Sequence, residues 1–175
     1  ILIHPENSDI VYVSAYGPLW KKGGDRGIYK TIDGGKSWNK ILFIDEHTGF
    51  NEIHMDPRNP DVLYATSHQR RRHVYTYVGG GPGSGIHKSV DVGYTWRKIN
   101  KGLPGVEIGR IGMDISDANP EVIYAIVEAS ERKGGFYKST NRGESWQKQS
   151  SKVTSGNYYQ EIFADPVDVD VVYVL

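Results

Sequence analysis

Three near-copies of one eight-residue motif recur along the chain, with the pattern Ser/Thr-x-Asp/Asn-x-Gly-x-Ser/Thr-Trp. The copies occupy residues 31–38, 89–96 and 139–146. Each lies between two short runs in which apolar and polar residues alternate, and two such runs joined by Asp/Gly-rich residues predict a β-hairpin. The motif therefore predicts an all-β protein built from a repeated hairpin unit.

Each motif position has a structural role. The Asp or Asn side chain accepts backbone N–H bonds within its own turn, and the glycine supplies a positive φ. The tryptophan begins the outgoing strand and offers a large face for packing between adjacent sheets, so we expect all three tryptophans to be largely buried at equivalent positions. The residues with these roles are Asp33, Gly35, Trp38, Asp91, Gly93, Trp96, Asn141, Gly143 and Trp146.

A second repeat alternates with the hairpins and reads as strand, Pro/Asn/Asp turn, and apolar strand ending in tyrosine. Each unit then has four strands, A to D, and four-stranded units at a period of about 50 residues indicate a β-propeller. We predict one domain, a propeller segment of three four-stranded blades plus half a blade, part of a larger propeller. The predicted bounds are 1–50 for blade 1, 51–108 for blade 2, 109–159 for blade 3, and 160–175 for the first two strands of blade 4.

Composition excludes several classes of function. The formal net charge of the 175 residues is zero, which argues against a nucleic-acid partner. The chain has no cysteine, so disulfides and thiolate metal sites are ruled out. No apolar run approaches the roughly 18 residues that a membrane helix needs, so membrane insertion is not expected. Neither His4 nor His54 forms a metal-ligand cluster by spacing, and we expect no metal and no cofactor.

The loops differ in regularity between the two ends of the predicted blades. The A–B and C–D turns are short and repeat closely, whereas the B–C and D–A loops vary, as a binding face on a rigid scaffold would. The B–C loop of blade 2, residues 67–84, is long, basic and aromatic. Its arginines either grip an anionic ligand group beside stacking aromatics or pair with acidic loops of neighbouring blades. The predicted ligand-binding residues are Trp20, Arg70, Arg71, Arg72, Tyr75, Tyr77, Arg110, Tyr158 and Tyr159.

The predicted A strands line the central channel. Aligning them places Glu52, Arg110 and Glu161 at one equivalent position near the channel mouth. Such a set is either a glycosidase-like or ligand-anchoring group, or a charge-compensating ring in a wet channel. Glu52 and Glu161 are the candidate catalytic residues under the first alternative, although their two-blade separation is wide for an acid/nucleophile pair. No catalytic residue is otherwise identified.

The repeated hairpin resembles the Asp-box, or bacterial neuraminidase repeat, of sialidases, xyloglucanase-type glycosidases, photosystem assembly factors and sortilin-type receptors. Further segments are similar to large bacterial proteins with sortilin-like propellers that are labelled glycosyl hydrolases; these segments are 17–20, 24–27, 69–72, 80–85 and 158–163. The resemblance covers essentially the whole chain. It departs from sialidases at Arg110-Ile111, which Gly112 follows where those enzymes carry proline.

Three functions are compatible with these features. The first is a binding module that is either secreted, and so extracellular, or periplasmic, and that takes a glycan or a peptide. The second is a glycoside hydrolase domain whose active site further blades complete, and the third is an assembly-factor scaffold. The expected partners are a glycan or peptide ligand and the remaining blades, which belong to the same protein or to another chain.

Overall fold

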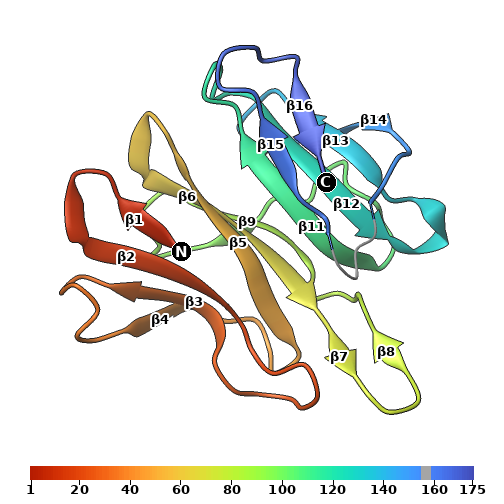
Figure 1. Ribbon diagram of the computed structural model, residues 1–175, viewed down its shortest axis with the longest axis horizontal. Helices are drawn as coiled ribbons and strands as arrows, with labels where there is room; N and C mark the ends of the chain where they lie inside the picture. The colour runs from red at the N-terminus through yellow and green to blue at the C-terminus, as the bar shows by residue number, and fades with distance from the viewer. Residues whose placement is uncertain (155–158) are drawn as a thin grey trace.

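The computed structural model describes residues 1–154 and 159–175, and within these ranges the chain forms antiparallel sheets and no α-helix. Three sheets have four strands each, in the orders β1-β2-β3-β4, β10-β9-β6-β5 and β11-β12-β13-β14, and a smaller sheet pairs β15 with β16. These are three consecutive propeller blades and the first two strands of a fourth (Figure 1).

The strand bounds follow the repeats. Blade 1 contains β1 (Leu2–His4), β2 (Asn7–Tyr16), β3 (Arg26–Thr31) and β4 (Asn39–Leu42). Blade 2 contains β5 (Thr48–Asp56), β6 (Asn59–Gln69), β9 (Gly85–Ser89) and β10 (Arg97–Lys98). Blade 3 contains β11 (Ile108–Ile115), β12 (Ile123–Ala129), β13 (Gly135–Ser139) and β14 (Gln147–Ser150). The remaining elements are β7 (Arg71–Arg72), β8 (Tyr77–Val78), the 3₁₀ turn η1 (Ser130–Arg132), β15 (Ile162–Ala164) and β16 (Val172–Val174).

The hydrophobic core lies between the blades. Tyr12 and Ile28 of blade 1 pack with Phe50 and Leu63 of blade 2 in one buried cluster. A larger cluster joins blades 2 and 3, and a third joins blade 3 to β15. Each sheet therefore buries its apolar faces against its neighbours in the chain, which is the arrangement that stabilises stacked repeat units.

The three C–D turns, residues 31–38, 89–96 and 139–146, share one hydrogen-bond pattern. In blade 2 the Ser89 hydroxyl donates to Asp91 Oδ1 at 2.7 Å and accepts from Gly93 N at 2.9 Å. Thr95 donates its backbone N–H to Asp91 Oδ1 at 2.8 Å and its hydroxyl to Oδ2 at 2.6 Å. These bonds, led by that of the Thr95 hydroxyl, lower the pKa of Asp91 to about 2. Asp91 is therefore an ionised acceptor at neutral pH, which suits a structural role and not that of a proton donor.

Two successive residues in each turn adopt positive φ. The motif glycines Gly35, Gly93 and Gly143 have φ of 89°, 88° and 82°. The residue before each glycine is also left-handed, and in blades 2 and 3 it is Val92 at 59° and Arg142 at 57°. A β-branched residue in this region is strained. Sequence reasoning missed this second position, because only blade 1 has glycine there.

The carbonyl groups of Val92 and Arg142 anchor each turn to the preceding blade. Tyr12 Oη and Lys30 Nζ of blade 1 donate to Val92 O at 3.4 and 3.0 Å. In the next interface, Tyr64 Oη and Lys88 Nζ donate to Arg142 O at 3.3 and 2.9 Å. A tyrosine in the middle of the B strand and a lysine of the C strand thus form a repeated clamp. The clamp therefore connects the two sequence repeats: the tyrosine of the second repeat in one blade contacts the hairpin motif of the next blade.

The motif tryptophans differ in burial, so the expectation that all three are largely buried is wrong for Trp38. Trp146 is 3% exposed and its indole N–H donates to Ile99 O of blade 2 at 2.8 Å. Trp96 is partly buried against the cluster between blades 1 and 2. Trp38 is 42% exposed. Trp96 and Trp146 pack on the preceding blade, whereas among the described residues no blade precedes that of Trp38.

Candidate functional site

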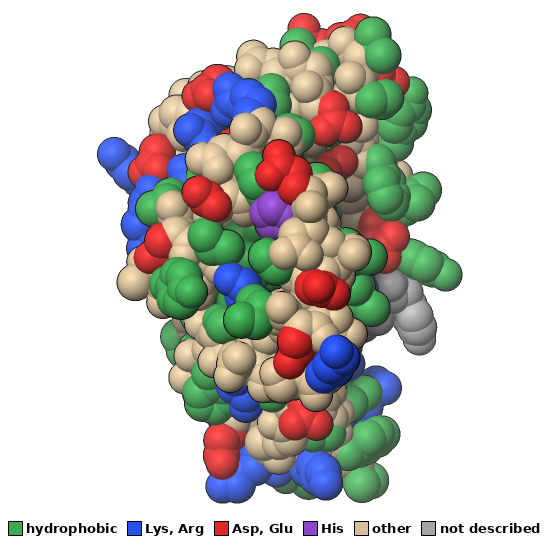
Figure 2. Space-filling view, turned by 90° about the vertical axis from the view of Figure 1, so that its left-hand side faces the viewer, with side chains coloured by type: hydrophobic (Ala, Val, Ile, Leu, Met, Phe, Trp, Pro, Cys, Tyr) green, Lys and Arg blue, Asp and Glu red, His purple; other side chains and the backbone are tan. Residues whose placement is uncertain are grey.

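The irregular loops of the blades gather on one side of the molecule. In Figure 1 the β1–β2, β3–β4 and β5–β6 turns point to one side, while the β2–β3 loop and the β7–β8 hairpin lie on the opposite side. We call this second side the loop face. Figure 2 shows the left-hand side of Figure 1, which carries the β1–β2 and β3–β4 turns and not the loop face, and acidic and basic side chains are mixed on it.

The arginine run of blade 2 starts at the end of β6. Arg70 lies with its guanidinium carbon 3.8 Å from the centroid of the Tyr16 ring, and its backbone N–H donates to His47 O at 3.1 Å. Arg71 and Arg72 form β7, which pairs with β8. Arg72 N donates to Leu19 O at 2.9 Å, so the B–C loops of blades 1 and 2 are joined.

The predicted aromatic residues on this face are accessible to different degrees. Trp20 is 61% exposed, Tyr75 is 86% exposed and stacks on His73, and Tyr159 is 63% exposed. Tyr77 is half-buried with Arg72 over its ring at 5.4 Å. Tyr158 lies outside the described residues. The face therefore presents several aromatic surfaces that are not used by the core.

Two buried side chains, those of Arg26 and His68, contact the B–C loops from the interior of the protein. Arg26 is fully buried in β3 and donates to the backbone oxygens of Tyr16, Pro18 and Lys21. His68 is 1% exposed, contacts the Tyr16 hydroxyl through Nδ1, and lies 3.0 Å from Gly79 O through Nε2. Burial lowers the pKa of His68 to about 4. A neutral imidazole and a carbonyl-bound guanidinium thus form a rigid base for the loop face.

Strand register corrects the predicted equivalence of Glu52, Arg110 and Glu161. In blade 2 His54 lies opposite Tyr64, and in blade 3 Asp114 lies opposite Tyr124. Each of these two residues lies ten positions before the tyrosine that it faces, so Met113 is equivalent to Ile53 and not to Met55. The residue equivalent to Glu52 is therefore Gly112, opposite Ile126, and the predicted position of Arg110 is wrong.

The channel-side charges contact one another between neighbouring blades. Arg110 Nη2 lies 3.7 Å from Glu161 Oε1. Glu52 Oε2 accepts the backbone N–H of Met113 at 2.8 Å and lies 3.4 Å from His54 Nε2. His54 Nδ1 in turn lies 3.8 Å from Asp114 Oδ1. Glu52 thus links the inner strands of blades 2 and 3, and the described contacts do not bring Glu52 and Glu161 together as a pair.

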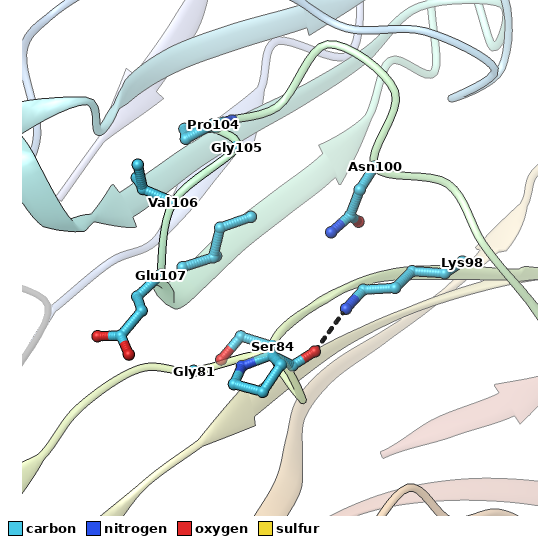
Figure 3. Close-up of a pocket in the computed structure, with 10 residues that line it drawn as sticks. Gly81, Ser84, Lys98, Asn100, Pro104, Gly105, Val106 and Glu107 are labelled. Atoms are coloured by element: carbon cyan, nitrogen blue, oxygen red, sulfur yellow. Dashed lines mark hydrogen bonds between the residues drawn. The ribbon is translucent and has the colours of Figure 1, made fainter.

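Two pockets flank the glycine-rich segment 79–82 on the loop face. One has a volume of about 290 Å³ and is lined by Tyr77, Gly79, Gly80, Glu107, Gly109, Glu128, Ala129 and Ser130. We call it the Tyr77 pocket. The other, about 320 Å³, lies between β10 and the loop 104–108, and Lys98 at its wall donates to Pro82 O at 2.8 Å (Figure 3). Glu107 lines both pockets.

Sequence reasoning missed Glu107 and Glu128. Glu107 lies in the loop before β11, and Glu128 lies near the end of β12, where its Oε2 accepts the backbone N–H of Arg110 at 3.2 Å. Neither residue belongs to a recurring motif, and only the pairing of β11 with β12 places both at the Tyr77 pocket. Two carboxylates at one pocket can act on hydroxyl or glycosidic oxygens.

The described residues contain no group of three or more His, Cys, Asp or Glu side chains placed to hold a metal ion. No helix among them is long and apolar enough to cross a membrane.

Comparisons with known proteins give a consistent fold. The chain is 26% identical over 179 residues to a xyloglucanase of Hypocrea jecorina (strain QM6a), covering 96% of this chain and 19% of that protein. A GH74 enzyme of Niastella koreensis superposes with a TM-score of 0.69 at 16% identity, covering 98% of this chain and 26% of that one. A GH74 xyloglucanase from Xanthomonas campestris superposes with a TM-score of 0.58 at 19% identity, covering 83% of this chain and 22% of that one. No family model matches the chain.

The structural likenesses define the class as a β-propeller, and the sequence similarity is to a glycosyl hydrolase. The chain spans only about a fifth of the length of the xyloglucanase that it matches. The structural likenesses, at under 20% identity, show the fold alone.

Proposed function

We propose that this chain is the glycan-binding part of an extracellular propeller, and that a neutral β-glucan of the xyloglucan type lies across its loop face. The observation that carries this proposal is the 26% identity to a xyloglucanase along 96% of the chain. The exposed rings of Trp20 and Tyr75 support it, because sugar rings pack their apolar faces on accessible aromatic side chains. The Tyr77 pocket adds carboxylates that accept hydrogen bonds from sugar hydroxyls.

The resemblance of the C–D turns to the Asp-box agrees with this proposal, since that repeat occurs in glycosidases. The second possible function is a sortilin-like module that binds a peptide, and the third is an assembly-factor scaffold. Neither function predicts that the chain binds one neutral glycan more tightly than another. Binding of xyloglucan oligosaccharides therefore separates the first proposal from these alternatives.

Replacing Tyr75 with alanine is expected to raise the Kd for a xyloglucan oligosaccharide about three- to tenfold, because one stacking ring is lost. Isothermal titration calorimetry measures the change. Tyr94→Ala is the matched control: Tyr94 is 82% exposed, close to the 86% of Tyr75, but lies in a C–D turn on the other side of the blade. Equal losses in both variants, or no binding by the unaltered chain, would contradict the proposal.

A hydrolase is the second candidate, and the placement of Glu107 and Glu128 at one pocket favours it. In this case one carboxyl group protonates the glycosidic oxygen while the other acts as nucleophile or base. The release of reducing ends from xyloglucan by the unaltered chain measures this activity directly. Binding without release would leave the binding function alone.

A further inference from the structure

Arg70, Arg71 and Arg72 form a run of positive charges without a direct ion pair among the described residues. Among the described residues no Asp or Glu oxygen lies within 4.0 Å of these three side chains, whereas Arg58, Arg97, Arg110 and Arg142 each pair with a carboxylate. The structure thus does not show these arginines paired with acidic loops of neighbouring blades. Clustered like charges without counter-charges repel one another, and a bound anion relieves this repulsion.

The first two arginines of the run are held in place. The Arg70 guanidinium stacks on Tyr16 at 3.8 Å, and its backbone is bonded to His47 O. The Nε atoms of Arg70 and Arg71 are shielded from solvent and have no hydrogen-bond partner among the described residues. Both side chains are only partly exposed. Partly desolvated, preoriented guanidinium groups bind an anion more strongly than freely moving ones, because less entropy is lost.

Two tyrosine hydroxyls lie in the same electrostatic environment. Burial raises the pKa of Tyr16, and the positive charges of Arg70 and Arg110 act in the opposite direction. Burial also raises the pKa of Tyr77, with Arg70 again opposing it. Both tyrosines therefore remain neutral hydroxyls at neutral pH. The Tyr77 hydroxyl can donate a hydrogen bond to an anion near Arg70, whereas the Tyr16 hydroxyl donates to His68 Nδ1. Tyr77 also lines the neighbouring pocket, so the cationic group and the pocket are continuous.

We propose that Arg70 and Arg71 form an anion subsite beside the Tyr77 pocket and that it takes the carboxylate of an acidic sugar unit in the bound glycan. The proposal rests on the proposed glycan-binding function and extends its ligand class from neutral β-glucans to glycans that carry an acidic sugar unit. The planar guanidinium fork matches the two oxygens of a uronate carboxylate. Arg72, which is exposed above the Tyr77 ring, adds long-range attraction at the edge of the subsite.

Two cello-oligosaccharides of equal length test the proposal, one neutral and one with a single C6 oxidised to the carboxylate. The 175-residue chain is expected to bind the acidic sugar about tenfold more tightly at low salt. This preference is expected to disappear in Arg70→Gln/Arg71→Gln and to shrink at high salt. Arg97→Gln is the control, because it also removes a charge but lies on the outer strand β10, paired with Glu144. Circular dichroism melting checks that the variants fold.

The outcomes separate the two proposals. Acidic preference that survives in the double variant places the anion elsewhere and overturns the subsite. Equal affinity for both sugars also overturns it, while the proposed glycan-binding function stands. Failure to bind either sugar contradicts the glycan-binding function itself. If the double variant melts early, Arg70→Lys/Arg71→Lys replaces it: this variant keeps the charges but loses the planar fork, and a retained full preference would overturn the bidentate carboxylate contact.

Discussion

Lowering the pH from 7 to 4 is expected to destabilise the protein by about 3 kcal/mol for each of two buried histidines. His68 and His87 are 1% and 7% exposed, and burial lowers the pKa of each to about 4. The unfolded chain binds protons on these side chains near pH 6.5, whereas the folded chain binds them only near pH 4. Stability is therefore complete above about pH 6.5 and falls steadily as the pH approaches 4.

Burial lowers the pKa of both imidazoles, whereas the hydrogen bond to Gly79 O raises that of His68. The His68 Nε2–H donates to Gly79 O, because a carbonyl oxygen can only accept, and Nδ1 then accepts from the Tyr16 hydroxyl. His87 Nε2 lies 3.0 Å from the buried Ser67 hydroxyl. Both residues support the segment 70–84 of blade 2, since Ser67 also donates to Gly83 O. Acid should therefore loosen the loop face before the turn side.

Urea unfolding between pH 4 and pH 7 measures this dependence. His68→Gln and His87→Gln should each remove about half of the pH-dependent loss, and the double variant should remove most of it. Glutamine keeps hydrogen-bonding capacity but has no proton to gain in this range. A double variant with the same slope as the unaltered chain would show that other groups cause the acid sensitivity.

Replacing Gly143 with alanine is expected to cost about 2–4 kcal/mol of unfolding free energy, from left-handed strain and overpacking together. Gly143 has φ of 82°, and a Cβ there would lie 2.5 Å from Cδ1 of the buried Ile99 in blade 2. The interblade clamp leaves the turn little room to move away, because Tyr64 and Lys88 hold the carbonyl of the preceding residue.

Gly35→Ala is the matched control for this prediction. Gly35 has nearly the same backbone conformation, with φ of 89°, but a Cβ there would meet only Trp38 Cζ2 at 3.7 Å. The control should therefore show the strain alone, roughly 1–2 kcal/mol. Chemical denaturation of both variants gives the difference. Equal losses of unfolding free energy in the two variants would mean that the contact with Ile99 does not contribute to the destabilisation.

The loop face was predictable only in part. Its side of the blade followed from the irregular B–C and D–A loops, and the candidate residues Arg70 and Tyr77 followed from composition. Glu107 and Glu128 could not be found in this way, because they lie 21 positions apart without a motif and meet only at the β11–β12 pair. The misplacement of Arg110 came from aligning Met113 with Met55, because the strand pairing instead makes Met113 equivalent to Ile53.

The sequence by itself determined the repeated hairpins, the turn hydrogen bonds and the glycines with positive φ. These features involve groups within about eight residues, so local hydrogen bonding and steric limits decide them. Only the tertiary structure decided that Trp146 is buried while Trp38 is exposed, and that Arg70 stacks on Tyr16. Those outcomes depend on which blade lies against a given surface, and identical motifs carry no information about their neighbours.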